Sequence, residues 1–187
     1  TVKSWAAGLD LKVPSVTPDP EPQEQKILVT YFSMPETTDP DNMTTEEANS
    51  TVVINGEVLG NTQYMAYVIQ ETTGADIFRI EPETPYPTDH ATLVAQAREE
   101  QSQNFRPALK ANVQNLDDYD VIFVGYPNWW GDMPMIMYSF FEQNDFSGKT
   151  IIPFNTHGGS GFSSTVSTIA GLEPDATVSQ NRKSISR

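Results

Sequence analysis

Three segments of the sequence place hydroxyl, aromatic and glycine residues in patterns that suit ligand binding. In the first, Ser33 is followed, after a long interruption, by Asn61 and Thr62 at the start of a predicted helix. Hydroxyls beside the free N–H groups of a helix N-terminus form a site for an anion. Because this set contains neither lysine nor arginine, dipoles and hydroxyls would hold the anion. The alternative is that Asn61 and Thr62 only cap the helix.

The second segment, residues 125–132, reads Gly-Tyr-Pro-Asn-Trp-Trp-Gly-Asp. Trp129 and Trp130 are neighbours in a loop, so their side chains point in different directions and do not form one apolar stripe. One tryptophan could fill the core while the other covers a planar, polarisable ring by aromatic stacking. The alternative is that both tryptophans are core residues that close the end of the sheet.

The third segment, residues 154–162, reads Phe-Asn-Thr-His-Gly-Gly-Ser-Gly-Phe. Its glycines permit the backbone to approach a ligand closely. His157 could donate a hydrogen bond to a ligand carbonyl or offset developing negative charge; the alternative is a loop histidine in water. Together, an anion cradle, an aromatic platform and a glycine-rich clamp predict a site for a phosphorylated planar cofactor.

Alternating strands and helices carry these three segments. Uninterrupted apolar runs such as residues 121–124 indicate strands buried on both faces, as in a parallel sheet. The alternation predicts a doubly wound α/β fold with five strands. Ligands of such folds bind outside the carboxyl ends of the strands, and each of the three segments follows such an end. The predicted strands are 26–32, 76–80, 120–125, 149–154 and 176–178, and the predicted helices are 61–72, 89–104, 133–143 and 163–170. The helix over 133–143 is expected to have Asp132 as its N-cap and Pro134 in its first turn.

The beginning of the chain differs in composition from the rest. The apolar residues with the spacing of one helix face are Val2, Trp5, Ala6 and Leu9. This spacing predicts a packed helix over residues 1–9. Residues 10–25 alternate prolines with acidic residues, a composition typical of an extended linker. The main domain is therefore expected over residues 26–187.

Composition restricts the classes of function. The 187 residues suit one compact domain. The 25 acidic and 11 basic residues give a formal net charge of −14, which opposes binding to nucleic acid and to anionic membranes but leaves basic protein partners open. The absence of cysteine excludes disulfides and thiolate metal sites, and only 2 histidines argue against a histidine-built zinc site. No apolar run is long enough for a transmembrane segment.

The sequence is similar to flavodoxins over roughly residues 26–178, in particular to the group with Gly-Tyr-Pro-x-Trp-Trp-Gly after the third strand. The matching pieces are Tyr31 to Ser33, Gly60 to Thr62, Gly125 to Gly131 and Phe154 to Gly161. The resemblance implies a flavodoxin-like three-layer sandwich with a five-stranded parallel sheet in the order 2-1-3-4-5. It also implies non-covalently bound FMN as the cofactor.

By the same resemblance, each segment takes a part in FMN binding. Ser33, Asn61 and Thr62 would bind the phosphate. The loop on one side of the isoalloxazine would comprise Pro127, Asn128, Trp129, Trp130 and Gly131. The loop on its other side would comprise Thr156, His157, Gly158, Gly159 and Ser160.

Two features depart from the flavodoxin pattern. Residues 34–59 interrupt a phosphate loop that is usually continuous, and within this insertion Asn55-Gly56 predicts a hairpin over residues 51–59. The insertion could cover the flavin edge, dock a partner or, as the simplest expectation, extend into solvent. Flavodoxins end with a fifth helix, which this sequence lacks after its last strand. Residues 1–9 resemble that helix, and we expect them to fill its position through circular permutation, a tandem neighbour or chain exchange.

The expected function is that of an FMN-binding electron-transfer protein. Its negative charge would disfavour the anionic reduced flavin, lower the reduction potential and steer basic redox partner proteins. Two alternatives stay open, an NAD(P)H-dependent flavin or quinone reductase and a flavodoxin-like binding module without FMN, so an enzymatic role is undecided. The acidic, proline-rich segment resembles the spacer of exported, surface-tethered proteins, which favours an extracytoplasmic over a cytoplasmic location.

Overall fold

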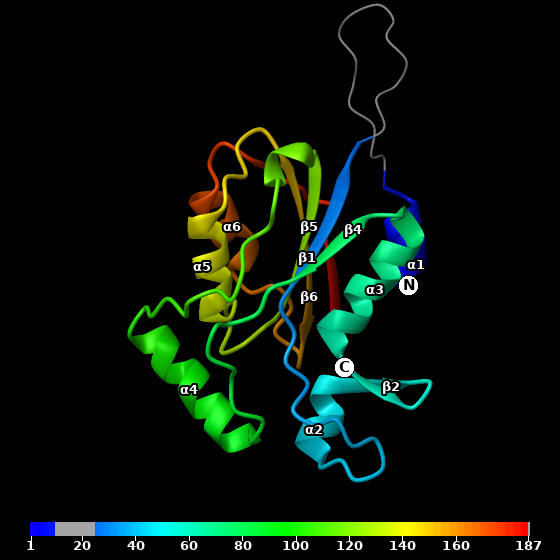
Figure 1. Cartoon of the computed structure of the whole chain (residues 1–187), viewed down its shortest axis with the longest axis vertical. Coiled ribbons are helices and arrows are strands. Elements are labelled where there is room, and N and C mark those ends of the chain that lie inside the picture. Colours follow the sequence, from blue (N-terminus) through cyan, green and yellow to red (C-terminus); the bar gives the residue numbers. More distant parts are fainter. Residues whose placement is uncertain (10–24, 187) are drawn as a thin grey trace, which may run out of the picture.

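A six-stranded parallel sheet forms the centre of the molecule (Figure 1). The computed structural model describes residues 1–9 and 25–186, so the predicted linker, except for its last residue, lies outside the described residues. The strand order is β4-β1-β5-β6-β7, with β8 also paired to β6. These strands are β1 (Ile27–Tyr31), β4 (Asp76–Arg79), β5 (Val121–Pro127), β6 (Thr150–His157), β7 (Thr177–Val178) and β8 (Lys183–Ser186). The predicted α/β fold and the order 2-1-3-4-5 of its first five strands are confirmed.

The fifth position of the sheet is made by two separate segments. β7 pairs with the beginning of β6, whereas β8 pairs with its end, from Phe154 to His157. The prediction ended the sheet at residue 178 and missed β8. The residues of β8 are only partly buried and lack an apolar run, because the strand lies at an edge of the sheet.

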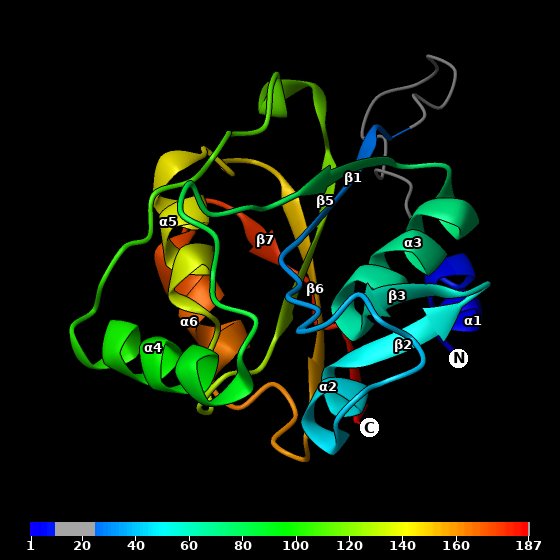
Figure 2. The same ribbon diagram turned by 60° about the horizontal axis from the view of Figure 1, so that its bottom comes forward.

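Helices cover both faces of the sheet (Figure 1 and Figure 2). On one face lie α4 (His90–Ser102), α5 (Met135–Gln143) and α6 (Thr165–Leu172), and on the other lie α1 (Val2–Ala7) and α3 (Asn61–Thr73). A short 3-10 helix, Leu116–Asp118, precedes β5. Within residues 1–9 and 25–186, none of these helices has the length and apolar character needed to cross a membrane.

The beginning of α5 differs from the prediction. The helix starts at Met135, with Pro134 at its N-cap position rather than in its first turn. The Asp132 carboxylate does not cap the helix; it accepts hydrogen bonds from the Met133 N–H at 2.7 Å and the Tyr138 hydroxyl at 2.8 Å. Pro134 explains the shift, because a proline restricts the residue before it to extended backbone.

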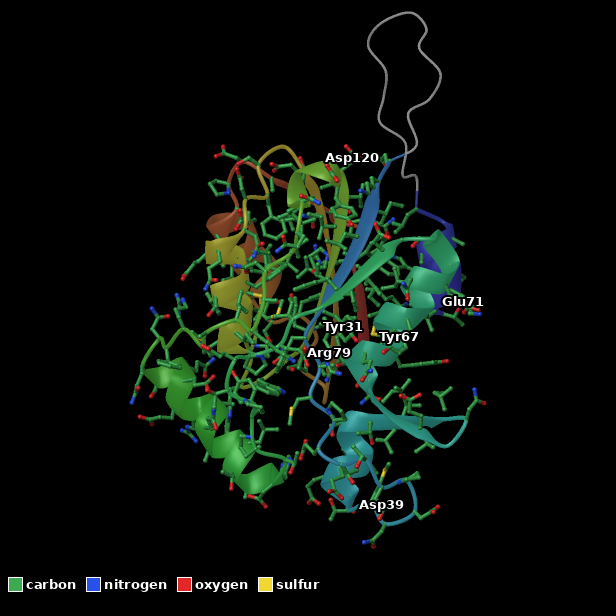
Figure 3. The ribbon with its side chains drawn as sticks, viewed as in Figure 1. Tyr31, Asp39, Tyr67, Glu71, Arg79 and Asp120 are labelled. Carbon is green, nitrogen blue, oxygen red and sulfur yellow. The ribbon has the colours of Figure 1, made fainter. Side chains whose placement is uncertain are left out.

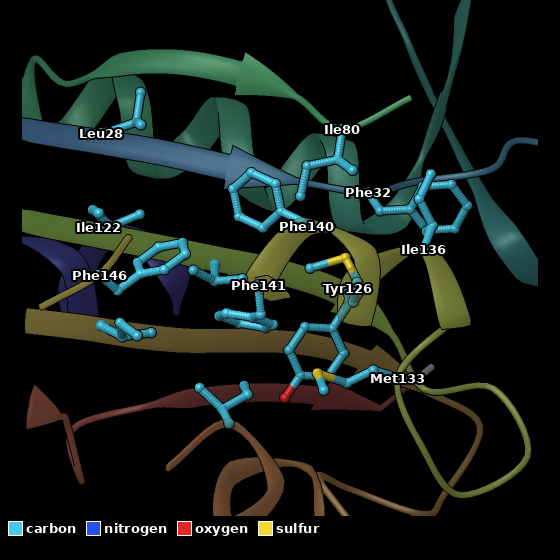
Figure 4. Packing of buried hydrophobic residues seen from close by; sticks show 14 of the residues in the cluster. Leu28, Phe32, Ile80, Ile122, Tyr126, Met133, Ile136, Phe140, Phe141 and Phe146 are labelled. Carbon is cyan, nitrogen blue, oxygen red and sulfur yellow. The ribbon is translucent and has the colours of Figure 1, made fainter. Parts of the chain in front are cut away.

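Apolar clusters fill the space between the sheet and its two helix layers. In the larger cluster, Phe140, Phe141 and Phe146 pack with ring centroids between 5.4 and 6.0 Å apart (Figure 4). Gly125 has a steric role in the sheet itself, since a Cβ at its position would lie 2.1 Å from the ring of Phe154 on the neighbouring strand. The first glycine of the tryptophan-rich segment is therefore required by packing.

The N-terminal helix α1 packs beside α3 and against the sheet. The Trp5 ring meets Phe123 edge-on at 5.7 Å, and its Nε1–H donates to Asn181 Oδ1 at 3.1 Å. At the surface, Lys3 pairs with Glu71 of α3 at 3.1 Å. This packing is compatible with the fifth-helix position, which stays a prediction together with the proposed routes by which the helix came there.

The insertion folds into a short helix and a hairpin. These are α2 (Thr45–Ser50), β2 (Thr51–Ile54) and β3 (Glu57–Gly60). Asn55 and Gly56 both have positive φ, 52° and 83°, as the predicted two-residue turn requires. Helix α2 was not predicted, although Thr44 and Glu47 form a capping box that is visible in the sequence.

Candidate functional site

A cavity of about 140 Å³ lies at the carboxyl ends of β1, β5 and β6, beside the N-terminus of α3. Most of the predicted site residues meet there. The predicted residues that line it are Ser33, Asn61, Thr62, Pro127, Asn128, Trp129, Thr156, His157 and Gly158. Trp130 lines a neighbouring cavity instead, and Gly131, Gly159 and Ser160 line neither of the two.

Within the part of the chain that the structure describes, no side-chain hydrogen bond caps the N-terminus of α3. Its N-cap is Gly60, which offers no side-chain oxygen to the N–H groups of the first turn. The Asn61 side chain donates to the carbonyl of Asn49 at 3.1 Å, and the Thr62 hydroxyl is hydrogen-bonded to the Thr156 hydroxyl at 2.8 Å. Neither side chain makes a capping hydrogen bond to the first turn of α3, so the capping alternative is not supported.

Gly60 also permits Ser33 to approach this helix end. A Cβ at position 60 would lie 2.0 Å from the Ser33 Oγ, although the φ of Gly60, −65°, is open to any residue. The glycine is therefore required by space and not by backbone conformation. It leaves the buried Ser33 hydroxyl beside Gly60, the N-cap residue of α3.

The backbone of Ser33 is held from the side of β4. The Arg79 guanidinium donates to the Ser33 carbonyl at 3.3 Å. Arg79 lies near Tyr31 and Tyr67, as Figure 3 shows. Burial, followed by a hydrogen bond with Tyr67, raises the pKa of Tyr31 far above its usual value, so Tyr31 stays a neutral phenol at this end of β1.

The two tryptophans have different environments. Trp129 is partly buried and packs edge-on against Phe32 at 5.4 Å and Tyr86 at 5.7 Å. Trp130 is 50% exposed, and its Nε1–H donates to the Val94 carbonyl at 3.2 Å. The guanidinium of Arg98 lies 4.8 Å from the Trp130 ring centroid. The alternative in which both tryptophans are core residues is therefore wrong.

A tight turn explains why the two indole rings lie in different environments. The backbones of Trp129 and Asp132 exchange hydrogen bonds of 2.9 and 3.0 Å, and the residues between them, Trp130 and Gly131, have φ of 55° and 78°. Two central residues with positive φ are characteristic of a type I′ turn. Gly131 thus shapes the loop, which explains why it does not line either cavity.

The glycine-rich loop is tied to β5 and β6 by two asparagines. Asn128 and Asn155 both donate to the carbonyl of Gly161, at 2.9 and 2.8 Å. His157 Nδ1 accepts a hydrogen bond from the Gly159 N–H at 2.8 Å. Since Nδ1 accepts, the neutral imidazole carries its hydrogen on Nε2. His157 is therefore a partly buried, oriented side chain at the cavity and not a loop residue free in water.

A larger cavity of about 630 Å³ adjoins the first on the side of α4. The two cavities share six lining residues, which are Glu36, Asn49, Ser50, Asn128, Trp129 and Gly158. The lining residues of the larger cavity that the sequence did not indicate come from the insertion (Glu36, Glu46, Asn49, Ser50) and from α4 (His90, Leu93, Val94, Ala97). The simplest expectation for the insertion, an excursion into solvent, is wrong for Glu36, which is buried between the two cavities.

Glu36 and His90 meet across this cavity. His90 Nδ1 lies 2.7 Å from Glu36 Oε2, although 54 positions separate them in the chain. No local sequence pattern predicts that these two residues pair. Glu36 occurs in a polar stretch, and His90 follows Asp89, the N-cap of α4. Only the fold brings the insertion and α4 together.

Comparisons with known proteins agree with this architecture. A search of curated protein sequences gave no match. A candidate flavoprotein from Bacteroides eggerthii is 28% identical, covers 87% of each chain and superposes with a TM-score of 0.65. A candidate flavoprotein from Bacteroides uniformis is also 28% identical, over 87% of this chain and 89% of that one, with a TM-score of 0.65. A Lactobacillus acidophilus flavoprotein in complex with FMN is 17% identical over 87% and 93% of the two chains, with a TM-score of 0.63.

The family model described as flavodoxin matches residues 50–184, which is more than half of the chain. The match covers α3, the tryptophan-rich turn, the glycine-rich loop and every strand of the sheet except β1 and the last residues of β8. The chain therefore belongs to the flavodoxin family.

Proposed function

We propose that this chain binds FMN non-covalently in the smaller cavity and its surroundings and transfers electrons through it. The observation that carries the proposal is the uncapped N-terminus of α3, with the buried Ser33 hydroxyl beside it, at the carboxyl edge of a flavodoxin-type sheet. Membership in the flavodoxin family and the FMN complex of the Lactobacillus neighbour support it.

The residues present fit a flavin phosphate. A phosphate at the N-terminus of α3 would meet backbone N–H groups and the positive end of the helix dipole. Ser33 and Thr62 add hydroxyls, and the described lining of the smaller cavity includes no lysine or arginine. A Cβ at Gly60 would push the Ser33 hydroxyl away, so the cradle depends on this glycine.

The two loops would hold the ring system. FMN supplies one- and two-electron redox chemistry when bound, and the chain supplies orientation and electrostatics. His157 lines the cavity with its Nδ1 occupied by the Gly159 N–H, so its Nε2–H would donate to a ring carbonyl. Asn128 and Asn155 keep the glycine-rich loop against β5 and β6 through the Gly161 carbonyl, which fixes the second wall.

The charge of the chain bears on its redox partners. A formal net charge of −14 disfavours an anionic reduced flavin, which lowers its potential, and attracts basic proteins over distances set by the ionic strength. The proposed partners are therefore basic redox proteins. The buried Glu36 side chain lies beside the smaller cavity, where its Oε2 is 2.7 Å from His90 Nδ1.

Titration with FMN and with riboflavin, which lacks the phosphate, tests the binding site. FMN fluorescence should be quenched on binding, and riboflavin should bind about 100-fold more weakly, because charge-assisted hydrogen bonds contribute about 1.5–3 kcal/mol each. Absence of quenching would refute FMN binding. Equal affinity for the two flavins would refute the phosphate site at α3.

Stopped-flow oxidation tests the electron-transfer role. The reduced FMN-loaded protein should be oxidised by a basic cytochrome c at a rate that falls steeply with added salt, since complementary charges steer the encounter. Ferricyanide, which is an anion, provides the matched control, and its rate should rise with salt. A salt-independent rate with the cytochrome would contradict steering by the acidic surface.

A further inference from the structure

We propose that Trp129, Tyr86 and Glu100 form a relay that moves an oxidising equivalent from the carboxyl edge of the sheet into the core. When a one-electron oxidant, such as an oxygen-centred radical, takes an electron from the Trp129 indole, Tyr86 replaces that electron and its hydroxyl proton passes to Glu100. The inference goes beyond the proposed FMN chemistry, because the step requires no flavin.

Trp129 is the side chain at which the oxidising equivalent enters. It lines both cavities and is partly buried. Indole is among the most easily oxidised side chains of a protein. Its ring meets two aromatic rings edge-on, those of Phe32 at 5.4 Å and Tyr86 at 5.7 Å between centroids. A phenylalanine ring is much harder to oxidise than a phenol, so Tyr86 is the neighbour that can return an electron to Trp129.

Tyr86 is placed to lose an electron and a proton together. It is 5% exposed, and its hydroxyl donates to Glu100 Oε2 at 2.7 Å. Burial, followed by the hydrogen bond with Glu100, raises the pKa of Tyr86 far above its usual value, so the phenol keeps its hydrogen at neutral pH. A phenol radical cation would be a charge buried among apolar residues, which is costly. Transfer of the proton to Glu100 leaves a neutral tyrosyl radical instead.

Glu100 is held in place as the proton acceptor. It belongs to α4 and is 7% exposed. Its other oxygen, Oε1, accepts from the Gln96 side chain, one turn earlier on the same helix, at 2.9 Å. Both carboxylate oxygens therefore have a protein donor, and Oε2 faces the hydroxyl that loses its proton. The tyrosyl radical would then lie in the apolar cluster that contains Phe32 and Leu93.

The electrons and protons of this step balance. The oxidant gains one electron from the indole of Trp129. One electron then moves from Tyr86 to Trp129, the O–H bond of Tyr86 breaks, and an O–H bond forms at Glu100 Oε2. The products are intact Trp129, a neutral tyrosyl radical and a protonated Glu100. The step thus removes a cation from the indole and an anion from the carboxylate, so it leaves no buried charge behind.

Another tyrosine of the chain has a carboxylate partner but no contact with Trp129. The Tyr119 hydroxyl donates to Asp76 Oδ2 at 2.8 Å, which matches the Tyr86–Glu100 bond in type and length. Tyr119 precedes β5 at the amino end of the sheet, whereas Trp129 follows the carboxyl end of the same strand. Within the described part of the chain, no ring contact joins Tyr119 to a tryptophan. Tyr119 is therefore the matched control for Tyr86.

Pulse radiolysis of the purified full chain, without added FMN, tests the relay. Azide radicals oxidise tryptophan side chains selectively, and tryptophanyl and tyrosyl radicals have distinct absorption bands. We expect tyrosyl absorption to grow as tryptophanyl absorption decays, with a first-order rate that does not depend on protein concentration. The rate should be lower in heavy water, because a proton moves with the electron. Absence of tyrosyl growth, a rate that rises with protein concentration, or equal rates in the two solvents would overturn the inference.

The substitutions Tyr86→Phe and Tyr119→Phe each remove one hydroxyl that donates to a carboxylate. Tyr86→Phe should lose the concentration-independent growth of tyrosyl absorption, whereas Tyr119→Phe should keep the parental rate. Growth at the parental rate in Tyr86→Phe, or the same loss in both variants, would contradict the assignment of Tyr86.

Glu100→Gln separates proton transfer from structure, because the amide oxygen still accepts a hydrogen bond but is not a base. Tyrosyl growth should be slower by at least about 10-fold, since a positioned base contributes on the order of 100-fold or more to a proton transfer. A parental rate would refute the role of Glu100.

A second pair of variants covers the case in which Tyr86→Phe does not fold. Trp129→Phe should abolish the concentration-independent growth, whereas Trp5→Phe, whose ring contacts Phe123 instead, should keep it. Growth that depends on Trp5 and not on Trp129 would overturn the relay. Because none of these measurements uses FMN, their outcome is independent of whether the proposed FMN site is correct.

Discussion

Replacing Gly60 by alanine would separate phosphate binding from fold stability. The new Cβ would lie 2.0 Å from the Ser33 Oγ but 3.3 Å from the Ser33 Cβ and 3.5 Å from Pro35 Cδ. The hydroxyl can therefore rotate away, at a cost of about 0.5–1.5 kcal/mol for a strained rotamer. The displaced hydroxyl no longer reaches a phosphate at α3, and a hydrogen bond to a charged group contributes about 1.5–3 kcal/mol. FMN affinity should thus fall about 10- to 150-fold.

Two measurements separate the loss of FMN affinity from the loss of fold stability. Flavin fluorescence titration gives the FMN affinity, and urea unfolding gives the free energy of unfolding with and without FMN. Without FMN, Gly60→Ala should lose no more than about 1.5 kcal/mol. With saturating FMN, it should lose a further 1.5–3 kcal/mol or so, because ligand stabilisation follows the dissociation constant.

Two controls test whether displacement of the Ser33 hydroxyl causes the loss of FMN affinity. Ser33→Ala should lose the same FMN affinity as Gly60→Ala, and the double variant should lose no more than either single one. Gly171→Ala in α6, where a Cβ meets nothing within 4 Å, should leave FMN affinity unchanged. Additive losses in the double variant, or parental affinity in Gly60→Ala, would refute the role of the glycine and the serine in phosphate binding.

Further predictions concern stability. Gly125→Ala should destabilise the fold by about 1–3 kcal/mol or more, because its Cβ would lie 2.1 Å from the Phe154 ring; thermal unfolding checks this, and an unchanged midpoint would contradict it. Burial, followed by the charge of Asp145, raises the pKa of Glu173 from 4.5 to about 7. The folded state then binds the extra proton, so stability should fall as pH rises from about 4.5 to 7, by on the order of 1 kcal/mol after solvent screening. Glu173→Gln should flatten this dependence in urea unfolding at pH 5 and 7.5, and an identical slope in parent and variant would argue against it. Trp5→Ala should cost about 2–3 kcal/mol, less than a fully buried tryptophan; a smaller loss in chemical denaturation would show that α1 contributes little to the core.

Local patterns in the sequence were sufficient to predict the parallel sheet and the edge of the sheet at which a ligand would bind. Apolar runs such as residues 121–124 can only be buried on both faces, which implies a parallel sheet with helices on either side. Asn55-Gly56 predicts its turn because both positions need positive φ, and both have it. Such features depend on neighbouring residues alone and survive in any tertiary context.

Boundaries and edges were predicted less well. Strand β8 was missed because a half-exposed edge strand lacks an apolar run, and α5 started later because Pro134 restricts the residue before it. The absence of α2 from the prediction has no such physical cause, since the capping box of Thr44 and Glu47 is readable from the sequence alone.

The sequence by itself determined which loops reach the ligand edge of this flavodoxin, because strand direction in a parallel sheet brings all carboxyl ends together. Only the tertiary structure decided what surrounds that edge. It buried Glu36 against His90, joined the Trp130 indole to the Val94 carbonyl, and made the insertion a wall of the larger cavity. These contacts join residues far apart in the chain, and their geometry follows from how helices and loops pack, which no local periodicity encodes.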